Sequence, residues 1–167
     1  LGMTVASARQ HVDNHTFISH NVARCESNEM FKYVLNDQSV GAFAGKVLVK
    51  ENCPRTVAYQ GNRNIVASAD AKMYSKPQLE IYTDDVKCSH GSATGQLNEE
   101  ALFYMRSRGI SEAEARQLLM QAFMSDVIDA VRLPALKDRL HHLVEKRFRG
   151  QLAMCADCTA ANCAAAK

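Results

Sequence analysis

The sequence predicts a protein that is mostly β-structure and is followed by a C-terminal α-helical region. Between residues 11 and about 97, short runs rich in β-branched and aromatic residues alternate with clusters of turn-forming residues, a pattern typical of strands. From residue 98 to residue 150, apolar residues recur every three or four positions instead, which indicates amphipathic helices. A chain of 167 residues can bury a core as one domain or as a sheet region with a helical appendage.

The connections between the predicted strands favour parallel pairing. The clearest strand runs are Thr16–His20, Phe31–Leu35, Val47–Val49 and Leu79–Tyr82, and the turn-prone clusters are residues 36–39, 60–64 and 68–70. The sequence lacks the Asn-Gly and Asp-Gly dipeptides that make tight hairpins. Many short strands without hairpin turns fit a parallel solenoid, in which each turn stacks only on its neighbours. The letters show no fixed period, so an irregular antiparallel sandwich stays open.

The first two helices have recognisable start and stop signals. Asn98 can cap a helix over residues 99–108, whose first turn carries two glutamates, and Gly109 suits its end. A capping box from Ser111 to Glu114 then predicts a long second helix that runs to about residue 132.

A third helix completes the helical region. Pro134 can open this helix, and Gly150 follows its last apolar residue. We therefore predict three domains: the C-terminal part of a β-structured core at residues 1–97, a helical domain at residues 98–150, and a flexible tail rich in Ala and Cys at residues 151–167.

Composition argues against several kinds of partner. The formal net charge is +2 and the Lys and Arg residues form no run, so nothing indicates binding to nucleic acid or to a membrane. No stretch reaches the roughly 20 apolar residues of a membrane helix. Six cysteines could form disulfides in an exported protein, but we expect reduced thiols in the cytoplasm. Because the sequence begins with Leu1, we expect a piece of a longer protein.

The most informative candidate site is the pair Cys88 and His90. Residues two apart in a strand share a face, and their Cα atoms lie roughly 7 Å apart. Thiolate and neutral imidazole are ligands suited to iron or zinc. Free cysteines are commonly buried for packing alone, so a purely structural role stays open. Two ligands cannot complete a metal site, so the others would have to come from another chain or another turn.

Two further groups of metal-ligating residues carry weaker signals. His11 and His15 have helical spacing, but four residues of strand cover about 13 Å, too far for one ion to bridge. Cys155, Cys158 and Cys163 resemble part of a zinc or cluster site without its fourth ligand, and we favour adventitious or redox-labile thiols there.

No enzyme signature is found in the sequence. Residues 41–46 resemble a phosphate loop, but the two glycines are one residue too close and Val47 replaces the Ser or Thr that would bind magnesium. Asp84 and Asp85 could serve a sugar-processing β-helix enzyme, yet adjacent residues of a predicted strand point to opposite faces.

Three segments of the sequence resemble the SufB/SufD family of iron–sulfur cluster assembly proteins. They are HVDNHTFISHN at residues 11–21, KPQLEIYTDDVKCSHGSATGQL at residues 76–97 and NEEALFYMRSRGISEAEA at residues 98–115. The similarity extends from His11 to Gly150. At residues 89–92 the sequence has Ser-His-Gly-Ser where the SufB branch has Glu-His-Glu-Ala, so the resemblance is to the SufD branch.

The resemblance implies a fold and a metal site. It implies a right-handed parallel β-helix followed by a C-terminal helical domain, in agreement with the division into strands and helices above. It further implies a non-catalytic subunit that has no cofactor of its own and that pairs with SufB through the β-helix. Iron or a nascent cluster would be held transiently at that junction, with His90 matching the histidine implicated there and Cys88 beside it.

The resemblance also implies that the ATPase SufC docks on the helices and supplies the energy. We predict these contacts at the end of the first helix and the turn after it: Tyr104, Arg106, Arg108, Gly109 and Ile110. The alternatives are a structural β-helix partner without metal ligation and, less favoured, a polysaccharide-processing enzyme. Whether the isolated chain forms a homodimer stays open.

Overall fold

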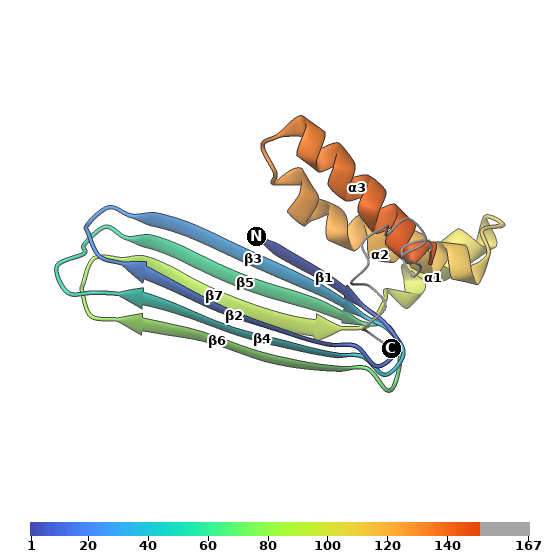
Figure 1. Ribbon diagram of the computed structural model, residues 1–167, viewed down its shortest axis with the longest axis horizontal. Helices are drawn as coiled ribbons and strands as arrows, with labels where there is room; N and C mark the ends of the chain where they lie inside the picture. The colour runs from blue at the N-terminus through green and yellow to red at the C-terminus, as the bar shows by residue number, and fades with distance from the viewer. Residues whose placement is uncertain (151–167) are drawn as a thin grey trace, which may run out of the picture. The chain divides into compact units, whose positions relative to one another are not determined.

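The structure is a computed structural model that describes residues 1–150 and contains seven strands followed by three helices in that range (Figure 1). The strands are β1 (Gly2–Ala6), β2 (His11–His20), β3 (Glu26–Leu35), β4 (Val40–Val49), β5 (Val57–Val66), β6 (Lys72–Ile81) and β7 (Lys87–Gly95). The helices are α1 (Glu99–Ser107), α2 (Glu112–Asp129) and α3 (Pro134–Phe148).

The chain divides into two compact units, residues 1–127 and the residues from 128 onward. Secondary structure changes from strand to helix close to residue 97, as the sequence predicts. The proposed domain boundaries themselves stay a prediction, and the predicted tail domain at residues 151–167 lies outside the described residues. Among residues 1–150, no helix is long and apolar enough to cross a membrane.

The strands form two parallel sheets, in the orders β1-β3-β5-β7 and β2-β4-β6. Consecutive strands alternate between the sheets, so the chain coils through a solenoid whose successive turns stack on one another (Figure 1). Residues that pair in neighbouring strands are separated along the chain by one full turn of the solenoid. Gly2 pairs with Phe31, Glu26 with Val57, and Val57 with Lys87. The predicted parallel β-helix is confirmed, and the antiparallel sandwich is wrong.

The corners between strands explain why no glycine signal marks the turns. Residues with a left-handed backbone occur at most corners, and none of them is a glycine: Ala8, Arg24, Asp37, Asn52, Arg55 and Asp85, with φ between 54° and 61°. Hydrogen bonds join successive corners, since Asp37 Oδ2 accepts from the Ala8 amide at 2.7 Å and the Asp37 amide donates to Ser68 Oγ at 2.8 Å. Ladders of this kind hold corner geometry that side chains otherwise disfavour.

The first turns of the solenoid enclose an aromatic layer, formed by Phe31, Tyr33 and Phe43. Tyr33 and Phe43 are almost fully buried, and the Phe31 and Phe43 rings lie 4.9 Å apart between centroids. The Tyr33 hydroxyl donates to the Ala42 carbonyl at 2.9 Å and accepts from Asn14 Nδ2 at 2.6 Å. Apolar burial therefore drives the packing here, while the one polar atom of the layer is hydrogen-bonded.

The prediction of a turn at residues 60–64 is wrong, because these residues lie in the middle of β5. Gln60, Asn62 and Asn64 alternate along the strand and are all at least 97% buried inside the solenoid. Amides are common in turns, but here they lie in the interior, where Asn64 donates to Asn62 and Gln60 donates to Glu29. Asn62 Oδ1 accepts from Asn64 Nδ2 at 2.7 Å, from Ser75 Oγ at 2.8 Å and from Ser92 Oγ at 3.4 Å. We name Asn62, Ser75 and Ser92 the polar layer.

The predicted helix signals of α1 and α2 are confirmed. Asn98 Oδ1 accepts from the Ala101 amide at 3.0 Å, and Gly109 follows α1 with φ of 88°. Ser111 Oγ accepts from the Glu114 amide at 3.3 Å. The second helix ends at Asp129, short of the predicted residue 132.

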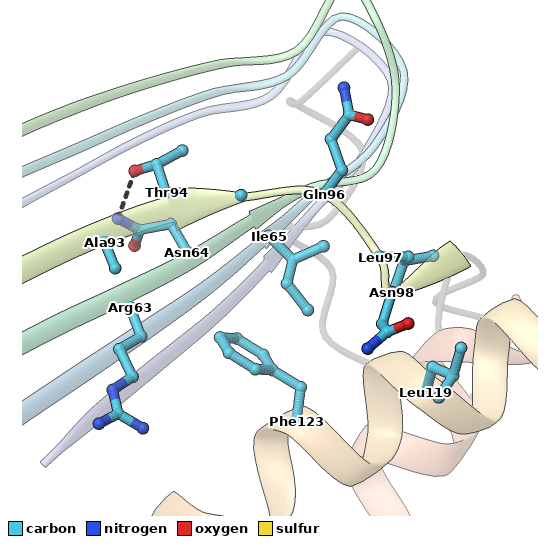
Figure 2. Close-up of a pocket in the computed structure, with 11 residues that line it drawn as sticks. Arg63, Asn64, Ile65, Ala93, Thr94, Gln96, Leu97, Asn98, Leu119 and Phe123 are labelled. Carbon is cyan, nitrogen blue, oxygen red and sulfur yellow. Dashed lines mark hydrogen bonds between the residues drawn. The ribbon is translucent and has the colours of Figure 1, made fainter. Parts of the chain in front are cut away.

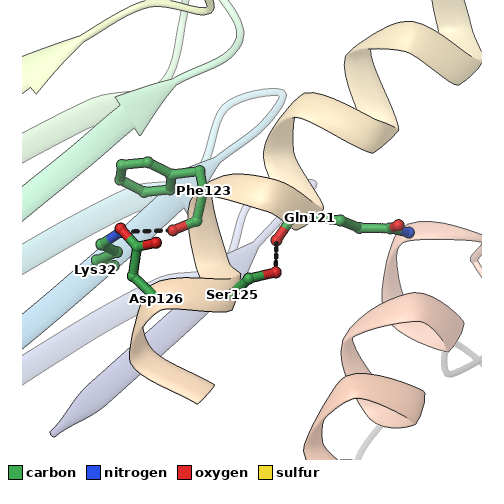
Figure 3. Close-up of polar contacts among 5 residues, drawn as sticks. All are labelled: Lys32, Gln121, Phe123, Ser125 and Asp126. Atoms are coloured by element: carbon green, nitrogen blue, oxygen red, sulfur yellow. Dashed lines mark hydrogen bonds and ion pairs between the residues drawn. The ribbon is translucent and has the colours of Figure 1, made fainter. Parts of the chain in front are cut away.

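A buried lysine fastens α2 to the outer face of the β1-β3-β5-β7 sheet. Lys32 lies on β3 between interior residues and its side chain is only 2% exposed. Its Nζ atom lies 2.6 Å from Asp126 Oδ2, 2.7 Å from the Phe123 carbonyl and 4.4 Å from the centre of the Phe123 ring (Figure 3). Arg116 adds a hydrogen bond of 2.7 Å to the Ala67 carbonyl. A buried ammonium is stable only with such partners, so this contact fixes where the helix lies.

The third helix belongs to the second unit and starts as predicted. Pro134 occupies its first turn, where a missing amide hydrogen costs nothing. Lys137 and His141, one helical turn apart, both approach Asp129 Oδ1, at 3.4 and 3.8 Å.

Candidate metal half-site on the last strand

Cys88 and His90 lie on β7, which is an edge strand of its sheet. In the β5–β7 register, Cys88 pairs with Ala58 and His90 with Gln60. Ala58 and Gln60 are both buried in the solenoid interior. Parallel strands in register place paired residues on the same face, so Cys88 and His90 both face the interior at the open end of the solenoid.

The two side chains differ in their surroundings. Cys88 is half-buried, and this burial raises the pKa of its thiol, against a smaller opposing effect from a hydrogen bond with the Ala58 backbone. The thiol therefore stays protonated at neutral pH, and a metal ion would have to displace its proton. His90 is exposed because no further turn covers it.

Within residues 1–150, no group of three or more His, Cys, Asp or Glu side chains is arranged to hold a metal ion. The predicted strand position of Asp84 and Asp85 is wrong, since both lie in the turn between β6 and β7. Asp85 has a left-handed backbone, and its carboxylate lies 3.7 Å from Arg55 Nε. Cys88 and His90 thus form at most half of a metal site.

The other metal candidates do not join this pair. His11 and His15 lie on β2, as expected for strand residues, and both are exposed on the outer face of the solenoid. His15 Nε2 lies 3.1 Å from Asp13 Oδ1. Cys155, Cys158 and Cys163 fall outside the described residues.

The segment that resembles a phosphate loop is a strand. Residues 41–46 belong to β4, and Gly41 and Gly45 are both buried, facing the interior. A Cβ atom on Gly45 would lie 2.4 Å from Gln60 Nε2, so this glycine serves close packing. Strand geometry does not form the loop that cradles phosphates.

The predicted docking residues lie at the end of α1 and in the turn after it. Tyr104 is 59% exposed, and the Arg108 guanidinium lies 5.2 Å from the centre of its ring. Arg106 Nη1 lies 3.4 Å from Glu112 Oε2, across the turn. Gly109 allows the left-handed turn, and the Ile110 amide donates to the Met105 carbonyl at 3.2 Å. Arg108 thus contacts Tyr104, whereas Arg106, two residues after Tyr104 in the helix, is paired with Glu112 instead.

Sequence reasoning missed two residues near these sites. Phe103 is 74% exposed beside Tyr104, whereas the preceding Leu102 is buried. An aromatic residue next to the buried stripe of a short helix is the signal that could have identified it. Gln60 pairs with His90 and is 2% exposed, but only the register of β5 with β7 reveals that relation.

A cavity of about 450 Å³ lies elsewhere, between α2 and the ends of β5 and β7. Phe123 of α2 points toward Ile65 of β5 across it (Figure 2), and Leu119 and Arg63 also line it. Its lining contains one charged residue, Arg63, and neither Cys88 nor His90. The cavity therefore lies apart from the candidate half-site.

The fold and the half-site define a parallel β-helix protein whose last turn carries two metal-ligating side chains at an open end. A family model described as "SUF system FeS cluster assembly, SufBD core domain" matches residues 1–123. The chain belongs to this SufB/SufD family.

Several curated proteins are similar over most of the chain. An iron–sulfur cluster assembly SufBD family protein of Synechocystis is 39% identical over 147 residues, which are 88% of this chain and 32% of the relative. The iron–sulfur cluster assembly protein SufD of Escherichia coli is 36% identical over 83% of this chain and 33% of its own length. The chloroplastic protein ABCI7 of Arabidopsis thaliana is 35% identical over 81% of this chain. The chain thus spans about a third of the length of these relatives.

Proposed function

We propose that this chain is part of a non-catalytic scaffold subunit for iron–sulfur cluster assembly. In this proposal, the subunit pairs with SufB at the open end of the solenoid and supplies His90, with Cys88 beside it, to iron or a nascent cluster. The observation that carries the proposal is the placement of two metal-ligating residues on the interior face of an edge strand, without a third ligand among residues 1–150.

The open end is chemically suited to being covered by another chain. β6 and β7 are edge strands, whose backbone groups can pair with strands of a partner. Ser75, Ser92 and Thr94 line the interior at this end, and their hydroxyl groups tolerate water before a partner binds. The missing ligands would then come from the partner, and iron is the cargo of the complex.

The names of similar proteins support a role in iron–sulfur cluster assembly. The similar proteins of Synechocystis and Escherichia coli are both named iron–sulfur cluster assembly proteins. Because this chain covers about a third of their length, the complete protein's role is inferred from the core domain that the family model matches at residues 1–123.

The test is anaerobic purification of the complete protein together with SufB and SufC, followed by iron and sulfide analysis. We expect His90→Ala to lower the iron content while the complex still assembles. His15→Ala is the matched control, because His15 is an exposed histidine on the outer face of the same solenoid. Unchanged iron in the assembled His90→Ala complex would refute the ligand role.

A second part of the proposal is that SufC docks on α1 and the turn after it. Exposed Phe103 and Tyr104 with Arg106 and Arg108 combine apolar area with positive charge, a composition favoured in protein interfaces. We expect Tyr104→Ala to reduce the amount of SufC that copurifies. Tyr74→Ala is the control, since Tyr74 is 61% exposed on β6. Equal loss of SufC from both variants would argue against a specific docking surface.

A structural role for Cys88 is the second candidate, favoured by its partial burial beside Ala58. Cys88→Ser separates the two roles. Iron content that is retained in Cys88→Ser but lost in His90→Ala would assign Cys88 to packing and leave His90 as the ligand.

A further inference from the structure

Three residues in successive turns form a column inside the solenoid, directed at the candidate half-site. Glu29 of β3 pairs in register with Gln60 of β5, and Gln60 pairs in register with His90 of β7. All three face the interior, because the strands are parallel and in register. A carboxylate, an amide and an imidazole are thus stacked in this order toward the open end.

The amide of Gln60 is held in one orientation. Its Nε2 atom donates to Glu29 Oε2 at 2.6 Å, and both residues are buried, at 2% and 6% exposure. A carboxylate only accepts hydrogen bonds, so the NH₂ group must point to Glu29 and the carbonyl oxygen must point away from it. That oxygen, Gln60 Oε1, is buried and has no hydrogen-bond partner in the part of the chain that the structure describes.

The opposite wall of the interior is shaped around this amide. Gly45 of β4 lies across from Gln60, and a Cβ atom there would lie 2.4 Å from Gln60 Nε2 and 3.0 Å from Thr16 Oγ1. The absence of a side chain at Gly45 lets the Gln60 side chain extend across the interior. A buried acceptor without a partner, kept in place by two neighbours, calls for a donor.

We infer that Gln60 is a positioning residue for His90. When the half-site is loaded, one ring N–H of His90 donates to Gln60 Oε1, and the other ring nitrogen is left unprotonated as the ligand. Glu29 orients Gln60 through its hydrogen bond to Nε2. Metal-bound histidines commonly have such a hydrogen-bond partner on their other ring nitrogen. This inference rests on the proposed function, in which His90 binds iron.

The test measures ferrous iron affinity in the anaerobic complex of the complete protein with SufB, by competition with a chelator. We expect Gln60→Met, which keeps the length but removes the acceptor, to weaken iron binding by about 10- to 100-fold. Thermal unfolding of the same complex reports whether the variant is folded. A folded Gln60→Met complex with unchanged affinity would overturn the inference, and so would a variant whose only defect is a lower unfolding temperature.

A double variant keeps the test decisive if Gln60→Met is poorly folded. Glu29→Gln combined with Gln60→Glu reverses donor and acceptor, so the two side chains still bond and residue 60 again offers an oxygen to His90. We expect this double variant to restore the affinity to near the original value. A double variant that folds but binds iron as weakly as Gln60→Met would contradict the inference.

His90→Ala distinguishes this inference from the proposed function. Unchanged affinity in His90→Ala refutes the iron-ligand role itself. Affinity that is lost in His90→Ala but kept in Gln60→Met leaves the proposed function standing and removes only the role of Gln60.

Discussion

The aromatic layer and the polar layer occupy the same positions in different turns of the solenoid. Phe31 pairs in register with Asn62, Asn62 pairs with Ser92, and Phe43 pairs with Ser75. At these positions the interior is therefore apolar in β3 and β4 and hydrogen-bonded in β5, β6 and β7, the strands nearer the open end. An exposed ring at the open end would lose the benefit of burial, whereas a hydroxyl group can bind water there. The composition of this layer thus changes from apolar to polar toward the open end.

Disrupting the aromatic layer should have the largest effect on stability. Phe43 is 1% exposed, and Phe43→Ala should lower the free energy of unfolding by about 3–5 kcal/mol, because burial is lost and a cavity remains. Chemical denaturation measures the change. Phe17→Ala is the control, since Phe17 is 62% exposed, and it should change stability by about 0.5 kcal/mol or less. Equal effects of the two substitutions would mean that the solenoid interior does not carry the stability.

Disrupting the polar layer should have a smaller effect. Asn62→Ala removes the acceptor of three hydrogen bonds, from Asn64, Ser75 and Ser92. It should lower the free energy of unfolding by about 2–3 kcal/mol. The loss is limited because the two serine hydroxyl groups can bond to water at the open end. The control is Asn28→Ala, an exposed position on β3. A loss as large as that of Phe43→Ala would contradict the idea that the open end tolerates water.

His20 adds a pH-dependent contribution at the other end of the interior. His20 is 4% exposed, its Nε2 lies 2.9 Å from Ser27 Oγ, and burial lowers its pKa from 6.5. The folded state therefore binds fewer protons than the unfolded state near that pH. Its stabilising contribution is present above pH 6.5 and is lost as the pH falls through the lower folded value.

Thermal unfolding at a series of pH values below neutrality tests this sign. We expect the unfolding temperature of His20→Gln to fall less on acidification than that of the unsubstituted protein. His15→Gln, on the outer face of β2, should follow the unsubstituted protein. Parallel curves for all three proteins would show that His20 does not contribute.

The corner ladder should give the smallest effect, because it lies outside both layers. Asp37→Ala removes the acceptor of the Ala8 amide and places alanine at φ of 54°, so it should cost about 1–2 kcal/mol. Asp37→Asn keeps an acceptor and tolerates the left-handed backbone, and should cost less than half as much. Denaturation midpoints measure both, and equal losses would indicate that the side-chain bond is unimportant.

The sequence predicted the class of fold because strand runs and missing hairpin dipeptides are local signals. It did not reveal β1 or β5, since β5 carries Gln60, Asn62 and Asn64, which favour turns when they are exposed. The shared face of Cys88 and His90 could be predicted from the alternation along one strand. Their relation to Gln60 could not, because register between strands about 30 residues apart is decided by stacking over the whole sheet.

The left-handed corners also determine where this chain can change length. A loop inserted after Asp37 would lengthen one corner and leave every interior side chain in place. One extra residue inserted between Gly41 and Phe43 would instead reverse the face of every following residue of β4. Phe43 would then point to the solvent, and Ala44 would point into the interior. Length variation in such a solenoid is therefore expected at its corners, while the strands keep their length.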